Sequence, residues 1–300
     1  MKSVKVLLAS YNGESYILEQ IQTILGQERV LVDLSVSDDS STDRTVSVLN
    51  ENFPDVFVKV NKPGTGSAAC NFIKMVCELD FTEKFEYVAF SDQDDVWLPD
   101  KLFRAITKLD EIYADLYCSN LTKWDMSTGA YSLLKKDFSQ QPFDYLFEGG
   151  SAGCTYVFTR IFAHNLQLFL RKANLRDWPE LSHDWLVYFY ARDRKFKVYI
   201  DKNSYIHYRI HSSNVHGHLN KLSWSTIVDK SREVLSGYHQ NQVKHFIRFL
   251  DSDTEGYKIY KEFLGNYFQR NITVLKYNTK LMRDWRKLVM FTLLNLLRFK

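Results

Sequence analysis

Three carboxylates stand close together directly after an apolar, strand-like run. The run is Glu86–Ser91, and Asp92, Asp94 and Asp95 follow it. Because side chains alternate between faces in an extended chain, Asp92 and Asp94 point the same way. Converging carboxylates repel each other unless a cation lies between them, and oxygen ligands suit Mg²⁺ or Mn²⁺ shared with a substrate's phosphates. The alternative is a solvated acidic turn in which Asp95 or Asp100 caps the next helix.

Polar groups also end the first two predicted strands. The segment Ala9-Ser10-Tyr11 ends the first strand, where an Asn-Gly pair breaks the chain into a loop and Tyr11 could hold a flat base. Asp38 and Asp39 end the second strand. A carboxylate there could accept hydrogen bonds from a base or a ribose, or it could cap the following helix.

Two further motifs lie later in the chain. Asp184 follows His183 at a predicted helix start, where the helix dipole keeps a carboxylate ionised, so it could act as a general base or as a cap. Arg209 and His211 end a late strand and share one of its faces. An arginine offers a fork for phosphate, and His211 could bind a metal or a diphosphate.

The elements that must position these residues alternate between strand and helix. Strands separated by helical patterns of about 10–15 residues predict a mostly parallel α/β sheet covered by helices, with ligands at the carboxyl ends of the strands. After about residue 219 the pattern is helical, so we expect a catalytic domain over 1–217 and a helical region over 218–300. The predicted strands are 4–9, 30–36, 56–60, 86–91, 114–119, 198–200 and 205–210, and the predicted helices are 14–27, 42–50, 67–79, 99–109 and 182–191.

Composition and charge exclude several classes of protein. The net charge of +3 conceals a basic end: residues 261–300 hold nine lysines and arginines against two acids. That asymmetry indicates a local anionic partner and argues against a nucleic-acid groove. The chain has no apolar run of transmembrane length and no leader-like start, and the four cysteines show no metal spacing, so we expect a cytoplasmic protein with free thiols.

One glycine-rich segment favours a different function. Residues 64–69 fit the dinucleotide pattern GxGxxA, which would suit a nucleotide-dependent oxidoreductase. The segment follows the third predicted strand, whereas that fingerprint belongs after the first strand of its unit, so an ordinary turn is the better interpretation. The chain contains no phosphate-binding loop of the GxxxxGK[ST] type.

Taken in order, the motifs resemble glycosyltransferase family 2, whose fold is called GT-A. The variant DQDDVW resembles bacterial polysaccharide enzymes of the rhamnosyltransferase kind, which build O-antigen or capsule. The resemblance covers residues 4 to about 217. The motifs that carry it are SYNGE (10–14), SDDSSTDRT (37–45), NKPGTGSAACNF (61–72), DQDDVWLPDKL (92–102), GSAGC (150–154), HDW (183–185) and YRIHSSN (208–214).

The resemblance implies a role for each candidate residue. Asp184 would be the catalytic base, and Asp92, Asp94 and His211 would hold Mg²⁺ or Mn²⁺. The acceptor and sugar pocket would involve Gly153, Cys154, His183 and Trp185. The nucleotide-sugar donor would contact Ala9, Ser10, Tyr11, Glu14, Asp38, Asp39, Asn71, Asp92, Gln93 and Arg209. Many members have an acidic residue where this chain has His183.

The implied reaction is a metal-dependent, inverting transfer of one sugar to a glycan acceptor. The donor would be dTDP-rhamnose or a UDP-hexose, and the acceptor a lipid-linked oligosaccharide. The alternatives are the oxidoreductase, a glycoside hydrolase with paired carboxylates, and a non-catalytic adaptor on the same fold. Joint retention of Asp92, Asp94 and Asp184 argues against the adaptor.

The end of the chain is predicted to form a basic amphipathic helix over 280–300. Leu281, Trp285 and Leu288 lie on one side, with Arg283 and Lys287 roughly opposite. Such a helix could dock on the rest of the protein, or it could lie on an anionic membrane and make the enzyme peripheral to the cytoplasmic face.

Overall fold

The computed structural model describes residues 1–175, 177–178, 180–211 and 236–298. The chain divides into two compact units, which we call the first unit (residues 1–137 and 150–211) and the second unit (residues 138–149 and 212–300). The expected boundary at residue 217 lies outside the described residues. The segment 138–149 differs from expectation, because it groups with the second unit.

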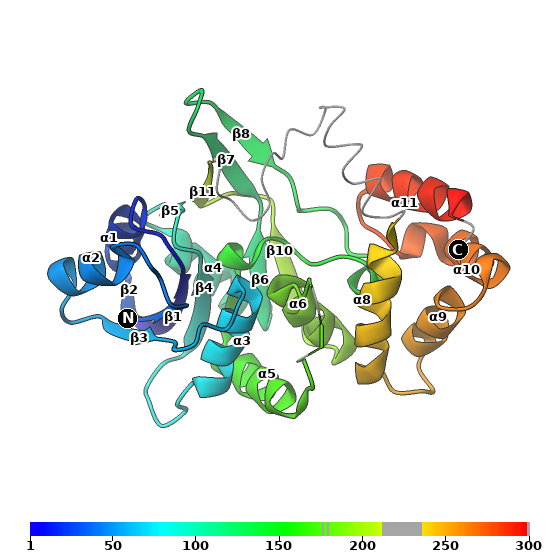
Figure 1. Ribbon diagram of the computed structural model, residues 1–300, viewed down its shortest axis with the longest axis horizontal. Coiled ribbons are helices and arrows are strands. Elements are labelled where there is room, and N and C mark those ends of the chain that lie inside the picture. The colour runs from blue at the N-terminus through cyan, green and yellow to red at the C-terminus, as the bar shows by residue number, and fades with distance from the viewer. Residues whose placement is uncertain (176, 179, 212–235, 299–300) are drawn as a thin grey trace. The chain divides into compact units, whose positions relative to one another are not determined.

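A seven-stranded sheet forms the centre of the first unit (Figure 1). Neighbouring strands in this sheet are parallel, except that β9 is antiparallel to both β4 and β6. The predicted, mostly parallel α/β fold is therefore confirmed. In spatial order the strands are β10 (Val198–Asp201), β6 (Leu116–Ser119), β9 (Val157–Thr159), β4 (Tyr87–Ser91), β1 (Lys2–Ser10), β2 (Val30–Asp38) and β3 (Phe57–Val60).

Helices pack against this sheet because its central strands are apolar on both faces. All five residues of β4 are buried, as are the last seven of β1, which is the pattern of a parallel sheet covered on two sides. Ile17, Ile21 and Ile24 form the buried face of α1 at helical spacing. The helices of this unit are α1 (Ile17–Leu25), α2 (Thr45–Asn52), α3 (Ala68–Glu78), α4 (Lys101–Ile112), α5 (Arg160–Lys172) and α6 (His183–Asp193).

A second, four-stranded sheet also belongs to the first unit, and the sequence did not predict it. Its strands in order are β5 (Val96–Trp97), β11 (Ile206–Ile210), β7 (Leu121–Asp125) and β8 (Tyr131–Leu134). Figure 1 shows β7 and β8 lying side by side as a projecting hairpin. Because β5 comes directly after the acidic segment at the end of β4, this sheet continues from the place where the candidate site residues gather.

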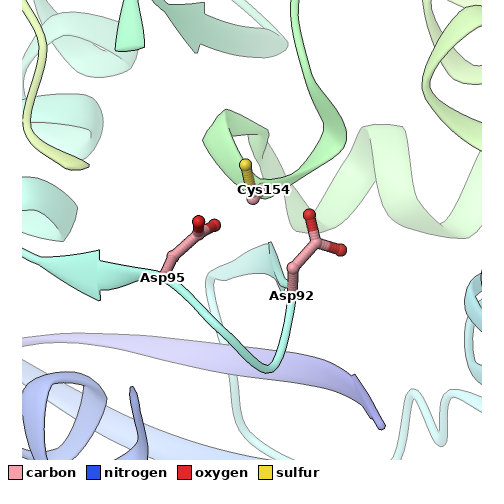
Figure 2. Close-up of side chains that lie close together, drawn as sticks. All are labelled: Asp92, Asp95 and Cys154. Carbon is pink, nitrogen blue, oxygen red and sulfur yellow. The ribbon is translucent and has the colours of Figure 1, made fainter. Parts of the chain in front are cut away.

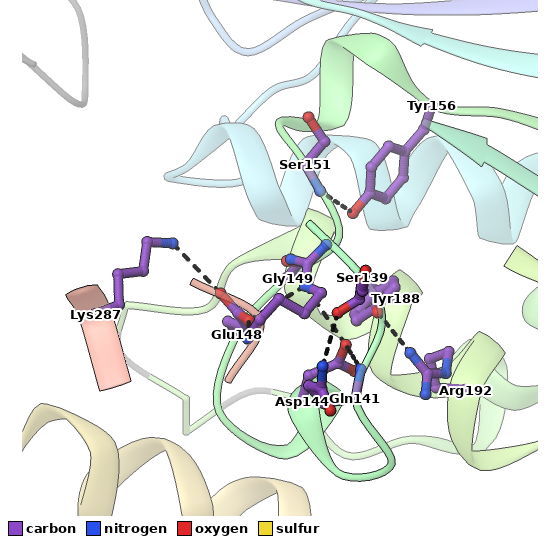
Figure 3. A network of polar contacts seen from close by, with 11 residues as sticks. Ser139, Gln141, Asp144, Glu148, Gly149, Ser151, Tyr156, Tyr188, Arg192 and Lys287 are labelled. Carbon is purple, nitrogen blue, oxygen red and sulfur yellow. Dashed lines mark hydrogen bonds and ion pairs between the residues drawn. The ribbon is translucent and has the colours of Figure 1, made fainter. Parts of the chain in front are cut away.

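The residues of the second unit that the structure describes are mostly helical, as the sequence predicted. Glu148 and the nearby Asp144 hold Arg283 by ion pairs of 3.2 and 3.5 Å, and Lys287 reaches Glu148 at 3.4 Å (Figure 3 labels Asp144, Glu148 and Lys287). These contacts fix the segment 138–149 to the start of α11. The elements are η1 (Asp144–Leu146), α8 (Tyr238–Phe246), η3 (Ile247–Phe249), α9 (Glu255–Phe263), α10 (Tyr267–Tyr277), η4 (Asn278–Lys280) and α11 (Trp285–Leu297).

Among the described helices, none combines the length and apolar character that crossing a membrane requires. The four cysteines carry no disulfide.

Candidate active site

The acidic loop, residues 92–95, leaves the carboxyl end of β4. Figure 2 shows Asp92 and Asp95 from this loop facing Cys154, which comes from the short helix η2 (Gly153–Thr155). Their candidate ligand atoms lie within 4.8 Å of one another. Burial, and then the charges of Asp94 and Asp184, raise the pKa of Asp92 to about 7. Negative charge therefore accumulates around Asp92. Asp184, which the sequence suggests as the catalytic base, contributes to that charge.

Asp94 and His211 form a direct pair at the same loop. Asp94 Oδ2 lies 2.8 Å from His211 Nε2. The two residues are far apart in sequence, and β11 brings His211 to the loop because it pairs with β5. The structure thus brings together the carboxylate and the imidazole that the sequence assigned to a metal.

Arg209 is nearly fully buried beneath this pair. Its Nε donates to the Asp94 carbonyl at 2.9 Å, and its Nη2 contacts Glu19 at 2.6 Å. The guanidinium lies 4.9 Å from the Tyr16 ring and 4.7 Å from the Trp124 ring. Arg209 was expected to bind donor phosphate. In the structure Arg209 holds the backbone of the acidic loop through the Asp94 carbonyl, which is a positioning role.

The residues of this cluster fit a hard or borderline divalent cation. Asp95 is fully buried, and neither of its carboxylate oxygens receives a hydrogen bond within the described chain. Burial, and then the charges of Asp94 and Asp92, raise its pKa well above the ordinary value. Burial also raises the pKa of the Cys154 thiol, which disfavours the thiolate that softer metals select. The carboxylates of the acidic loop and the imidazole of His211 are donors that suit Mg²⁺ or Mn²⁺.

Asp184 lies in the first turn of α6. Ser182 caps the helix, and Asp184 Oδ1 accepts hydrogen bonds from the Ser182 hydroxyl and from the Trp185 backbone N–H at 2.7 Å. Tyr156 donates its hydroxyl proton to the Asp184 carbonyl at 3.1 Å. These bonds fix the carboxylate while it remains close enough to Asp92 to influence that residue's pKa.

His183 belongs to the packing behind the site. Its ring stacks on Phe72 at 4.3 Å and meets Phe90 edge-on at 5.7 Å. A Cβ on Gly153 would lie 2.2 Å from His183 Nε2, so only glycine leaves space for the ring. Cys154 and Trp185 are buried as well. His183, Cys154 and Trp185 therefore form a packed layer behind the acidic loop.

Asp38 and Asp39 lie at the carboxyl end of β2, and both are buried. Asp38 accepts hydrogen bonds from the hydroxyls of Ser10 and Ser41 at 2.9 and 2.5 Å. Asp39 accepts from the backbone of Thr65 and Gly66 at 2.5 and 3.0 Å. In this structure the two expected base ligands thus organise the loops after β1, β2 and β3.

The remaining donor candidates also connect loops. Gln93 bonds both backbone groups of Tyr11, at 2.8 Å to the N–H and 2.9 Å to the carbonyl, which joins the β1 loop to the acidic loop. Tyr11 itself is 56% exposed and available to a base. Glu14 accepts from the Arg44 backbone at 2.8 Å. Asn71 is buried and bonds Ser37, while Ala9 and Ser10 are buried at the end of β1.

With this geometry established, comparison with known proteins decides the family. Residues 5–174 match the pattern described as glycosyl transferase family 2. The chain belongs to glycosyltransferase family 2. It is a glycosyltransferase, as predicted.

Similar proteins agree with this assignment. The chain is 36% identical over 213 residues to dTDP-rhamnosyl transferase RfbG of Shigella flexneri, covering 69% of this chain and 72% of the relative. It shares its fold with S. aureus TarS 1–349 in complex with UDP, with a TM-score of 0.56 at 14% identity over 98% of this chain and 90% of that one. A mannosyltransferase from Pyrobaculum calidifontis, in complex with GDP-Man and Mn²⁺, aligns with a TM-score of 0.50 at 15% identity over 91% of this chain and 74% of that one.

Family membership removes support from the oxidoreductase alternative. The glycine-rich segment that suggested it runs from Gly64 to Ala69, and Asp39 holds its backbone. Gly66 adopts a positive φ of 88°, which explains the glycine as a turn requirement.

Some residues of the site were missed or undervalued in the sequence. The sequence suggests Asp95 only as a possible helix cap, whereas in the structure it is buried and lies close to Asp92 and Cys154. Lys101 is buried, with its Nζ 3.4 Å from the Trp97 ring, and burial lowers its pKa to about 7. No motif in the sequence marks Tyr16. It belongs to the site because its ring centroid lies 4.6 Å from that of His211, a residue far away in the chain.

Proposed function

We propose that the protein is an inverting, metal-dependent glycosyltransferase that moves rhamnose from dTDP-rhamnose to a glycan acceptor. The observation that supports this most directly is the convergence of Asp92, Asp94, His211 and Asp184 at one edge of the sheet. A cation held by Asp94 and His211 would stabilise the departing diphosphate, and a fixed carboxylate would take the acceptor's proton, so the arrangement suits a single displacement with inversion.

The proposed roles follow from the contacts. Asp94 and His211 would bind Mg²⁺ or Mn²⁺ together with Asp92. The cation would stabilise the negative charge that develops on the departing nucleoside diphosphate. Asp184, held by Ser182 and the Trp185 N–H, would accept the proton of the acceptor hydroxyl as that oxygen attacks the anomeric carbon.

The nucleoside end of the donor would lie at the carboxyl ends of β1 and β2. Tyr11 would cover the base, and the backbone of the loops that Asp38, Asp39 and Gln93 organise would line its edge. The similarity to a dTDP-rhamnosyl transferase supports dTDP-rhamnose. A UDP-hexose is the alternative donor.

The acceptor is proposed to be a lipid-linked oligosaccharide at an anionic membrane surface. Helix α11 supports this, because it exposes an apolar stripe at i, i+4 spacing while Leu288, Phe291 and Leu294 face inward. Arg283 and Lys287 pair with Glu148, so they do not form the free basic face that the sequence suggested. The exposed stripe consists of Trp285, Val289, Leu293 and Leu297. It would lie in the headgroup region and make the enzyme peripheral to the cytoplasmic face.

A donor screen tests the proposed function. Purified protein is incubated with dTDP-rhamnose, UDP-glucose or GDP-mannose, with Mn²⁺ or with EDTA, and release of the nucleoside diphosphate is measured as the sugar passes to water, which takes the place of the acceptor hydroxyl. We expect release from dTDP-rhamnose that depends on the metal and is lost in Asp94→Asn. Release from none of the donors, or release that is unaffected by EDTA, would overturn the proposal.

A further inference from the structure

A row of flat side chains crosses the four-stranded sheet. The strand register places Arg209 beside Trp124 and Trp124 beside Tyr131, so the three lie on one face. The Arg209 guanidinium lies 4.7 Å from the Trp124 ring. The Trp124 and Tyr131 rings are 5.8 Å apart and nearly parallel, at 13°. The side chains therefore form one continuous stack across β11, β7 and β8.

The inner end of this row is anchored at the candidate metal site. Tyr16 lies 4.6 Å from the His211 ring and 4.9 Å from the Arg209 guanidinium. Arg209 also donates to the Asp94 carbonyl at 2.9 Å. Arg209 and Tyr16 thus fix the position of the stack relative to the acidic loop.

The outer end of the row is open. In the described chain β8 is the last strand of its sheet, so Tyr131 has a strand neighbour on one side only. Tyr131 is 53% exposed, and Leu133, on the same face, is 57% exposed. His207 contacts Tyr131 at 5.0 Å and adds a polar edge. Two strand spacings, about 10 Å, separate this surface from Arg209.

The chemistry of the surface suits a sugar chain. A pyranose has C–H faces that pack on flat rings and a rim of hydroxyls that needs polar neighbours, and sites for such ligands combine aromatic walls with a few polar groups. The surface of Tyr131, Leu133 and His207 offers that combination. The nucleoside of the donor belongs at the ends of β1 and β2, in the other sheet, so a glycan reaching this hairpin would be the acceptor.

We propose that the outer end of this row, formed by Tyr131, Leu133 and His207, is a subsite for the acceptor glycan, which binds sugar residues beyond the one that receives the new sugar. This inference rests on the proposed glycosyl transfer, because it assigns the second substrate of the same site. The stack would set the direction in which the acceptor chain leaves the reaction centre.

Binding of glycans to the wild type and to matched variants tests the subsite. The protein is titrated with a rhamnose tetrasaccharide, chitotetraose or maltotetraose while its intrinsic fluorescence is measured, and Trp124→Phe shows which part of the fluorescence change comes from Trp124. We expect one of these probes to bind and Tyr131→Ala to weaken it about tenfold, since one stacking partner is lost. Phe57→Ala is the control, because Phe57 is an exposed aromatic on β3, in the other sheet. Circular dichroism confirms that each variant is folded.

The outcomes separate this inference from the proposed function. If wild-type protein releases nucleoside diphosphate with metal but none of the three tetrasaccharides binds, or Tyr131→Ala binds as wild type, the subsite is wrong and the transferase stands. If no donor is turned over, the proposed function fails whatever the glycan result. Binding of phospholipid vesicles at Tyr131 in place of the tetrasaccharides would also overturn the subsite.

Discussion

At the scale of single residues, the acidic side chains fall into two groups. Asp92, Asp94 and Asp184 lie close enough to interact, because burial and then the charges of Asp94 and Asp184 raise the pKa of Asp92. Asp38 and Asp39 are bonded to hydroxyl and backbone groups of their own loops. The sequence predicted which residue types gather at the strand ends. It could not predict their partners, because each hydrogen bond depends on loops from other parts of the chain.

Replacing the proposed base should separate binding from chemistry. Asp184→Asn keeps the shape and can still accept a hydrogen bond from Ser182, but it cannot take a proton. We expect unchanged donor affinity and a fall of about 10²–10⁴-fold in the transfer rate. Single-turnover kinetics with saturating donor measure this. Transfer at near-normal rate in the variant would remove Asp184 from the mechanism.

Asp92 should make the metal-free protein sensitive to pH. Burial and the charges of Asp94 and Asp184 raise its pKa to about 7, whereas the unfolded value is 3.8. A carboxyl group with a raised folded pKa contributes stability below the unfolded value and loses it as the pH rises through the folded value. In EDTA, the free energy of unfolding should therefore fall between about pH 4 and about pH 7. Asp92→Asn should flatten this fall in urea titrations, and an equal fall in both proteins would contradict the assignment.

At the scale of elements, the site depends on a few tight contacts between loops and helix ends. The sequence predicted the strand–helix alternation because buried parallel strands and amphipathic helices have distinct apolar patterns. It missed the four-stranded sheet, since β5 has only two residues and β8 only one buried residue. It also missed α5, whose buried face includes Gln167 beside apolar residues. Short or half-exposed elements carry too weak a pattern to be predicted.

The contact between η2 and α6 can be tested with a rescue. In Gly153→Ala the new methyl group would collide with the His183 ring, which must move together with the start of α6. We expect a loss of about 1–3 kcal/mol in the free energy of unfolding and a lower transfer rate. Adding His183→Ala should make room for the methyl group. The double variant should then be less destabilised than the sum of the single changes, and strict additivity would rule out the contact.

At the scale of the whole molecule, each of the two units has its own core. The second unit includes the segment 138–149, which the Glu148 to Arg283 ion pair connects to α11. Sequence could place a helical region after residue 219, but it could not assign residues 138–149 to it, because that link joins residues 135 positions apart. The family itself could be predicted, since it depends on the order of motifs and not on any one contact.

The exposed stripe of α11 should determine membrane binding. Val289→Glu with Leu293→Glu places charge on the outer face while the buried residues remain unchanged, so folding should be preserved. We expect binding to anionic vesicles to weaken at least about tenfold, as apolar burial is lost. Leu31→Glu, at an exposed leucine of β2, is the control. Sedimentation of both variants with vesicles tests this, and full pelleting of the α11 variant would contradict it.

The most direct test of the central claim is the affinity for dTDP, measured by isothermal titration with and without Mn²⁺ in wild type and Asp94→Asn. We expect tight binding by wild type only when Mn²⁺ is present, and loss of that metal effect in the variant, because Asp94 and His211 are the proposed ligands of the cation. Equal affinity in all four experiments would contradict it and reduce the acidic loop to a structural turn.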